Sequence, residues 1–253
     1  MSKVVIEKNT YEYPNWISRM VSAMTSGLIE PLISHPIDVA KTMQQANNTT
    51  FTETMKNMLK GGTRTCYAGI IPKVIGNVPM RGVFWVSLYE FSDATRNHKS
   101  TFVKYILPGI CAGFVQTFVD NYIEIIKIAL ITSNKTTQKK YFIGFPACAL
   151  RNMIFAGTLT SLTLQKDKLH INTFQAASLG GFIGSIVTQP LDVVKTIQQS
   201  NINHKDNMIK IMIDLVKNQG LSRLWTGWHY RSIMAFVNMG IGMTVYDFLR
   251  DKI

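Results

Sequence analysis

A carboxylate and an amine recur three residues apart at three places in the chain. Residues 36–46 read PIDVAKTMQQA, residues 190–200 read PLDVVKTIQQS, and a third, divergent copy at residues 122–131 reads YIEIIKIALI. An acid and a base at this spacing project from the same face of a helix. If three such helices converge, the side chains can form a ring of ion pairs between helices. The residues concerned are Asp38, Lys41, Glu124, Lys127, Asp192 and Lys195.

A proline precedes the acid by two residues in two of these copies, at Pro36 and Pro190, and Tyr122 replaces it in the third. A proline inside a helix lacks the backbone donor and clashes with the preceding turn, so it bends the helix. We therefore expect each charged pair to lie just after a bend in an apolar helix. Cyclic order predicts one ion pair between each two helices: Asp38 with Lys127, Glu124 with Lys195, and Asp192 with Lys41. Solvated ion pairs within each separate helix are the alternative.

The composition excludes several classes of protein. The three cysteines are scattered and the five histidines lack metal-ligand spacing, so no disulfide framework, zinc site or other cofactor is expected. No arrangement of serine, histidine and aspartate suggests an enzyme. The net charge of +12 indicates an anionic partner, but the basic residues are dispersed rather than gathered in one stripe, which disfavours nucleic acid.

Long apolar segments indicate membrane helices. Residues 169–191 contain no Asp, Glu, Lys or Arg and are long enough to cross a bilayer, which takes roughly 20 residues. Shorter apolar segments cover residues 105–119, 152–165 and 232–246. Charges that interrupt such segments favour helices lining a water-filled cavity. The first 15 residues lack the apolar core of a cleavable signal, so any targeting information is expected to be internal.

Small residues recur in the first helix of each predicted repeat. Nine residues before the proline position, and again four residues earlier, the chain has glycine or alanine. These positions are Gly27 and Ala23, Gly113 and Gly109, and Gly181 and Ala177. Small residues four apart let two membrane helices approach closely. We expect these faces to make the tight helix contacts.

Each repeat then has a connector that ends in an aromatic residue followed two positions later by glycine, at residues 67–69, 142–144 and 225–227. Connector helices are expected around residues 51–60 and 208–218, where Gly61 and Gly220 would end them. The second repeat has too few residues here for such a helix.

The second helices are expected to begin near Pro72, Pro146 and Trp228 and to run to the ends of the repeats. The chain is therefore predicted to be a single domain, residues 1–253. Its repeats are expected at residues 15–97, 102–168 and 172–252.

The threefold pattern of proline-x-acid-x-x-base followed by aromatic-x-glycine resembles the mitochondrial carrier family over residues 15–252. The resemblance implies an all-α membrane protein with six transmembrane helices, arranged as three pseudo-symmetric two-helix repeats around a central cavity. It implies alternating access between two gates in the inner mitochondrial membrane. The expected state is a monomer, with the lipid bilayer and a bound anionic lipid as partners.

The resemblance also assigns roles to the charged residues. The matrix-side gate would consist of the ring residues Asp38, Lys41, Glu124, Lys127, Asp192 and Lys195. Gln45 and Gln199, four residues after the base, resemble the family's glutamine braces, and Ile131 stands in their place in the second repeat. The ends of the second helices resemble a cytoplasmic-side gate, with Tyr89, Glu90, Lys168, Tyr246, Asp247 and Arg250. Solvated helix ends are the alternative for this second set.

The family's substrate contacts lie seven and eight residues after the connector glycine. Counting in this chain assigns Gly76, Asn77, Arg151, Asn152, Met234 and Ala235. Arg151 is the one charge among them, and its planar guanidinium suits a carboxylate or a phosphate. Arg81 and Arg231 add positive potential near the same depth. Glu30, in an otherwise apolar helix, could receive a substrate amine or neutralise one of these arginines.

The resemblance and these charges favour a carrier that exchanges a small anionic metabolite, a nucleotide or a carboxylate. Two alternatives remain open. A zwitterionic or cationic substrate such as an amino acid would use Glu30 together with Arg151. A carrier-derived membrane scaffold that no longer transports would account for Tyr122, Ile131 and the short second connector. Such a scaffold has little physical reason to keep six costly charges inside a membrane.

Overall fold

The computed structural model describes residues 16–47, 56, 58–67, 70–132, 144–200 and 207–250, and this part of the chain is helical, without strands. Its α-helices, in chain order, are α1 (Trp16–Asn47), α3 (Gly62–Cys66), α4 (Ile70–Thr95), α5 (Thr101–Tyr105), α6 (Leu107–Thr132), α7 (Phe145–Thr163), α8 (Thr173–Val187), α9 (Gln189–Ser200), α10 (Met208–Gln219) and α11 (Trp228–Arg250). A short 3₁₀ helix, η2 (Leu221–Trp225), precedes α11.

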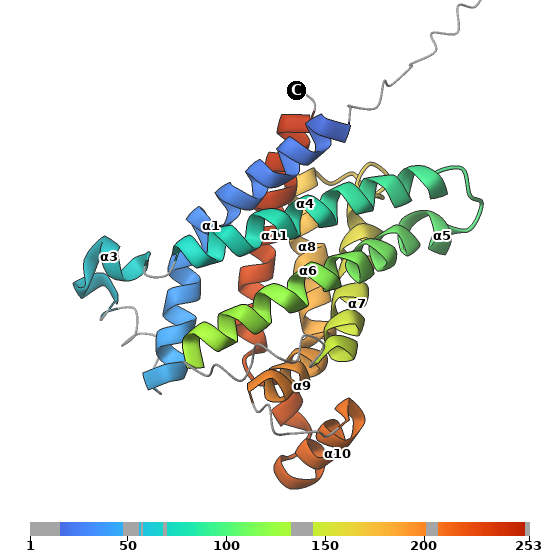
Figure 1. Ribbon diagram of the computed structural model, residues 1–253. Helices are drawn as coiled ribbons and strands as arrows, with labels where there is room; N and C mark the ends of the chain where they lie inside the picture. Colours follow the sequence, from blue (N-terminus) through green and yellow to red (C-terminus); the bar gives the residue numbers. More distant parts are fainter. Residues whose placement is uncertain are drawn as a thin grey trace, which may run out of the picture.

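The long helices form a closed ring. Helix α1 packs against α4, α4 against α6, α6 against α7, α7 against α8, α8 against α11, and α11 against α1. The start of α1 and the end of α11 lie side by side at one end of the bundle, while α9 and α10 lie at the other end (Figure 1). Side chains of α4, α6, α7 and α11 line the space inside this ring.

The predicted bend is seen clearly in the third repeat. Helices α8 and α9 meet at an angle of 59°, and the interruption at Thr188 lies two residues before Pro190. Helix α6, in which Tyr122 replaces the proline, runs without interruption over 26 residues. Helix α1 also runs without interruption, over 32 residues, although Pro31 and Pro36 lie inside it. The helix is therefore broken next to the proline position in the third repeat and not in the first.

The small residues lie where the sequence predicts tight contacts. A Cβ atom at Gly27 would lie 3.1 Å from the Cα of Val78 in α4, and one at Gly181 would lie 2.8 Å from the carbonyl oxygen of Ala235 in α11. A Cβ at Gly113 would overlap the carbonyl of Asn152 in α7. The first helix of each predicted repeat therefore packs its small face against the second helix of the same repeat.

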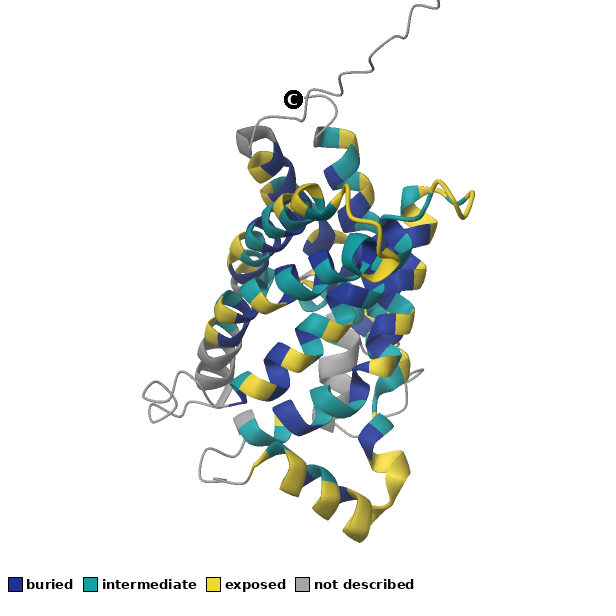
Figure 2. Cartoon of the chain, turned by 90° about the vertical axis from the view of Figure 1, so that its right-hand side faces the viewer, coloured by how far each residue is buried: buried dark blue, intermediate teal, exposed yellow. Residues whose placement is uncertain are grey.

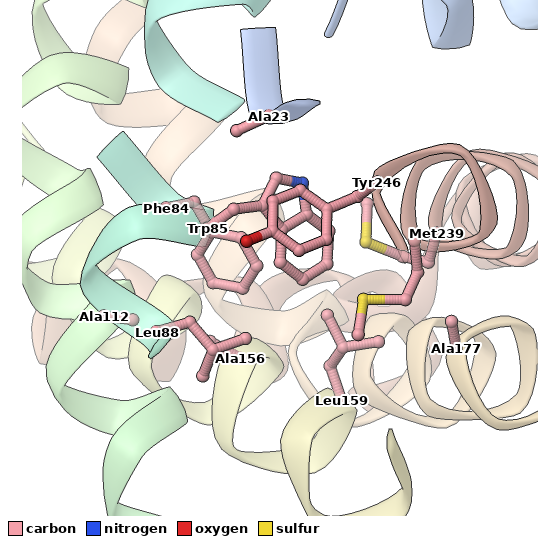
Figure 3. Close-up of a cluster of buried hydrophobic side chains, with 11 residues drawn as sticks. Ala23, Phe84, Trp85, Leu88, Ala112, Ala156, Leu159, Ala177, Met239 and Tyr246 are labelled. Carbon is pink, nitrogen blue, oxygen red and sulfur yellow. The ribbon is translucent and has the colours of Figure 1, made fainter. Parts of the chain in front are cut away.

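A cluster of buried apolar side chains closes the half of the bundle that holds the start of α1 and the end of α11 (Figure 3). Trp85 from α4, Leu159 from α7 and Tyr246 from α11 are each 0% exposed. The ring centroids of Trp85 and Tyr246 are 5.5 Å apart and the planes are inclined by 30°. Side chains from four further positions on α1, α6, α7 and α8 complete the contact: Ala23, Ala112, Ala156 and Ala177.

The helices expose many large apolar side chains and bury several charged ones. Buried and exposed positions alternate along the helices (Figure 2), and many of the exposed ones are large and apolar, such as Leu32 in α1 and Val187 in α8. Buried positions include charged side chains such as Glu30 and Arg81, which are rarely buried in soluble proteins. By length and hydropathy alone, residues Leu221–Leu249 can cross a membrane, as can the bent α8–α9 pair.

Two predicted helix ends have different outcomes. The end of the connector helix at Gly220 is confirmed, since α10 stops at Gln219 and Gly220 has a positive φ of 83°. The prediction that the second helix of repeat 2 continues to Lys168 is wrong, because α7 ends at Thr163 and residues 164–170 form turns. Of the first connector, Lys56 and Met58–Lys60 are helical, and the second connector lies outside the described residues.

The close approach of α6 and α7 at Gly113 predicts that a single added methyl group lowers the stability of the fold. Gly113→Ala should lower the apparent unfolding temperature in detergent by a few degrees, because overpacking costs about 1–3 kcal/mol. Gly82→Ala is the matched control: it makes the same change inside a helix, and its Cβ would be 3.5 Å from Met24, an ordinary contact. Equal unfolding temperatures for the two variants would show that α6 and α7 do not approach closely at Gly113.

Candidate functional site

A cavity of about 230 Å³ lies inside the ring of helices. Among the described residues that line it, the charged ones are three arginines, one each from α4, α7 and α11, and an aspartate from α6: Arg81, Arg151, Arg231 and Asp120. The remaining lining residues are polar or apolar: Met80, Phe84, Gln116, Asn152, Phe155, Met234, Ala235, Asn238 and Met239. The cavity therefore concentrates basic groups inside an otherwise largely apolar bundle.

Arg151 holds carboxylates from two different helices. One terminal nitrogen, Nη1, donates to Asp192 Oδ1 of α9 at 2.9 Å, and the other, Nη2, donates to Asp120 Oδ2 of α6. Its side chain is 14% exposed, so both ion pairs are largely shielded from water. Asn152 supports the arrangement, because its Nδ2 donates to Asp120 Oδ2 at 3.0 Å. Charge-assisted bonds of this kind are among the stronger hydrogen bonds in proteins.

Arg81 is paired inside the first repeat. Its Nε donates to Glu30 Oε2 at 2.7 Å and its Nη2 donates to Glu30 Oε1, so that the two planar groups meet through two parallel bonds. The side chains of Arg81 and Glu30 are 6% and 4% exposed. Of the two roles considered for Glu30, this geometry favours neutralisation of Arg81 over contact with a substrate amine.

Arg231 is anchored at the bend between α8 and α9. It donates from Nη2 to Thr188 Oγ1 at 2.9 Å and from Nη1 to the carbonyl oxygen of Ser185 at 3.1 Å. Its Nε lies 3.7 Å from Asp192 Oδ2, so Arg151 and Arg231 share the carboxylate of Asp192. The bend that Pro190 produces therefore positions one acid between two arginines.

The structure places four of the six counted contact residues at the cavity. Arg151, Asn152, Met234 and Ala235 line it. Gly76 and Asn77 are not among the described lining residues: both are buried, and Asn77 Nδ2 donates to the carbonyl oxygen of Gly27 at 2.9 Å, which joins α4 to α1. Counting from the connector glycine gives the depth of a residue, but the direction of its side chain depends on how each helix is rotated.

Asp120 is a site residue that the analysis of the motifs missed. It occupies the position two residues before the proline position, where the other repeats have Ser34 and Thr188. An acid in an apolar helix, replacing a hydroxyl residue of the other repeats, was the available signal.

Of the predicted ring of ion pairs, the structure describes only the side chains of the third repeat. Asp192 contacts Arg151 and Arg231, and Lys195 is buried, with 2% of the residue exposed. The backbones of the other members are helical, but their side chains lie outside the described part of the chain, as do those of the two glutamines. These residues are Asp38, Lys41, Glu124, Lys127, Gln45 and Gln199. The predicted pairing within the ring therefore stays a prediction.

Near the end of α11, away from α9, the carboxylate of Asp247 accepts hydrogen bonds from three side chains. Tyr89 Oη donates to Asp247 Oδ1 at 3.2 Å, while Lys166 Nζ and Thr173 Oγ1 each lie 3.1 Å from Asp247 Oδ2. The ring of Tyr89 stacks on Tyr246 with centroids 5.0 Å apart. Hydrogen bonds and stacked rings thus join α4, α11 and the turn after α7 above the cavity.

Two residues assigned to this end by resemblance do not contact Asp247. Glu90 accepts a hydrogen bond from Arg19 of α1 at 2.9 Å, with its side chain 59% exposed. Lys168 lies over the ring of Tyr105, 5.0 Å from the centroid, and Lys166 contacts Asp247 in its place. The reason is that α7 ends at Thr163, so the helical spacing no longer applies at position 168. The side chain of Arg250 lies outside the described residues.

Comparisons with known proteins agree on one family. The family model described as mitochondrial carrier protein matches residues 12–99 and 166–253. A probable mitochondrial 2-oxodicarboxylate carrier of Dictyostelium discoideum is 26% identical, with 93% of this chain and 90% of the relative covered. Mitochondrial citrate transporter A of Aspergillus niger is 24% identical over 98% of this chain and 95% of the relative. An electrogenic aspartate/glutamate antiporter of Rattus norvegicus mitochondria is 24% identical over 92% of this chain and 40% of its own length.

The contact between Lys166 and Asp247 predicts a measurable coupling. In a double-mutant cycle of Lys166→Met and Asp247→Asn, followed by apparent unfolding temperature in detergent, the coupling should be about 0.5–1 kcal/mol, since the partly exposed pair is screened by solvent. The matched cycle with Lys168→Met should show no coupling to Asp247. Coupling of Lys168 with Asp247 and none for Lys166 would restore the role that resemblance assigns to Lys168.

Proposed function

The chain belongs to the mitochondrial carrier family, and we propose that it exchanges a small carboxylate by alternating access through the cavity around Arg151. The protein is a transporter rather than an enzyme, and it is a multi-pass protein of the inner mitochondrial membrane. The observation that carries the proposal is a largely shielded arginine that lines a cavity and whose two terminal nitrogens each bind a carboxylate.

The proposed architecture has six membrane-spanning segments in three repeats. It is supported by the closed ring of long helices and by the contacts of the small residues within each pair of helices. Large apolar side chains on the outside of the ring favour the same arrangement, because lipid tails replace water there.

The size of the cavity favours a small carboxylate over a nucleotide. Pockets for drug-sized ligands typically measure about 300–1,000 Å³, and this one measures about 230 Å³. The relatives described above are named for 2-oxodicarboxylates, citrate and aspartate or glutamate, not for nucleotides. A nucleotide is therefore disfavoured as the substrate.

The mechanism uses the internal carboxylates as competitors of the substrate. Arg151 already binds Asp120 and Asp192, so a substrate carboxylate must displace one of them. Asp192 belongs to the charged ring, and its release from Arg151 would let it pair with the predicted partner Lys41. Buried ion pairs are exchangeable because the cost of desolvation offsets much of their attraction. Substrate binding would in this way supply the free energy that closes one gate and opens the other.

The divergent second repeat is the observation that favours the alternative, a scaffold that no longer transports. The family model leaves residues 100–165 unmatched, and this segment includes Tyr122. Against this alternative, the cavity retains three arginines, which are costly in a membrane unless they function. Transport therefore remains the better account.

Arg151→Lys tests the role of the guanidinium while keeping the charge. In liposomes, uptake of radiolabelled carboxylate should fall about tenfold or more, because an ammonium cannot hold two planar carboxylates in the same geometry. The apparent unfolding temperature should fall by a few degrees at most, since a positive charge stays next to Asp120 and Asp192. Arg223→Lys, at an exposed position in η2, is the control and should transport normally. Undiminished uptake by Arg151→Lys would remove Arg151 from the binding site.

A further inference from the structure

We propose that Asp120 is a specificity-determining residue that binds the amino group of the substrate, so that the cavity selects an acidic amino acid over the corresponding oxo acid. The inference rests on the proposed function, because it names the substrate class of the same cavity. It concerns an acid outside the three repeated charged pairs.

The charges that line the cavity have unequal freedom to meet a substrate. Arg81 is held by two parallel bonds to Glu30, and both side chains are nearly fully buried, so this pair is neutral as a unit. Arg151 and Arg231 share the carboxylate of Asp192, which the proposed mechanism releases from Arg151 when a substrate carboxylate binds. Once Asp192 is released, two cations and Asp120 line the cavity, and they are the complement of a molecule with two carboxylates and one ammonium.

The carboxylate of Asp120 has bonding capacity left. Among the described residues, the hydrogen bonds to Asp120 all end on Oδ2: from Arg151, from Asn152 at 3.0 Å and from Cys148 at 3.5 Å. A carboxylate has about four acceptor sites over its two oxygens. Asp120 is 6% exposed and lines the cavity, so a ligand there meets an acceptor already fixed in place by α7.

Hydrogen bonding at Asp120 also discriminates between an acidic amino acid and the corresponding oxo acid. An ammonium offers three donors to the carboxylate. An oxo group offers only an acceptor, which would leave Asp120 facing like partial charge without a donor. Sites that are built to hydrogen-bond one group discriminate strongly against an analogue that lacks it.

The test compares matched ligands in liposomes that contain the purified full chain. L-Glutamate and 2-oxoglutarate have the same carbon skeleton and the same two carboxylates, and L-aspartate with oxaloacetate repeats the comparison at a shorter length. Wild-type protein should take up the amino acid of the better-transported pair about tenfold or more efficiently than its oxo acid. Asp120→Asn should reduce this ratio to about one by raising the KM for the amino acid. Asp120→Glu should keep the preference, and Asp214→Asn, at an exposed position in α10, is the control and should leave the ratio unchanged.

Three results would overturn the inference. A wild-type preference for the oxo acid would contradict it and leave carboxylate exchange intact. Equal losses for both ligands in Asp120→Asn, with unfolding temperature preserved, would show that Asp120 merely orients Arg151. Failure of Asp120→Glu to keep the preference, in a folded variant that still transports the oxo acid, would also contradict it. If the wild type transports neither class, the proposed function itself fails.

Discussion

The structure depends on a guanidinium that joins three helices through two carboxylates. Arg151 on α7 binds Asp120 on α6 and Asp192 on α9, in a region that excludes most water. Removing one partner of a buried ion pair leaves an uncompensated charge, which costs about 3–5 kcal/mol. These ion pairs hold the helices around the cavity. In the proposed mechanism a substrate carboxylate replaces one of the two acids, which would link substrate binding to helix movement.

The rest of the fold shields the ion pairs of Arg151 from water. Small residues bring the two helices of each pair into backbone contact, which leaves no room for side chains between them. The aromatic cluster of Trp85, Tyr89 and Tyr246 covers the cavity at one end, with Asp247 and Lys166 beside it. Apolar side chains face outward, where a lipid phase would receive them.

Much of this could be predicted from the sequence because it depends on repetition and spacing. Small residues four apart predicted the close helix contacts, and Pro190 predicted the bend between α8 and α9. Counting from the connector glycine found Arg151, the central cation of the cavity.

Features that depend on three-dimensional neighbours could not be predicted in this way. The partners of Asp192 on other helices follow from how α7, α9 and α11 are rotated, which no spacing within one helix specifies. Lys166 replaced Lys168 because α7 ends earlier than the repeat pattern suggests. Asp120 does not follow from repetition, because the other two repeats have hydroxyl residues, Ser34 and Thr188, at the matching position.

Thermal unfolding of the purified protein in detergent, with and without ligands, tests most directly whether the cavity binds small carboxylates. A ligand that binds the folded state stabilises it by mass action, by about 2.7 kcal/mol at a hundred times its Kd. We expect four- and five-carbon dicarboxylates or acidic amino acids to raise the apparent unfolding temperature, and nucleoside triphosphates at equal concentration to leave it unchanged. A shift with nucleotides and none with any carboxylate would contradict the account.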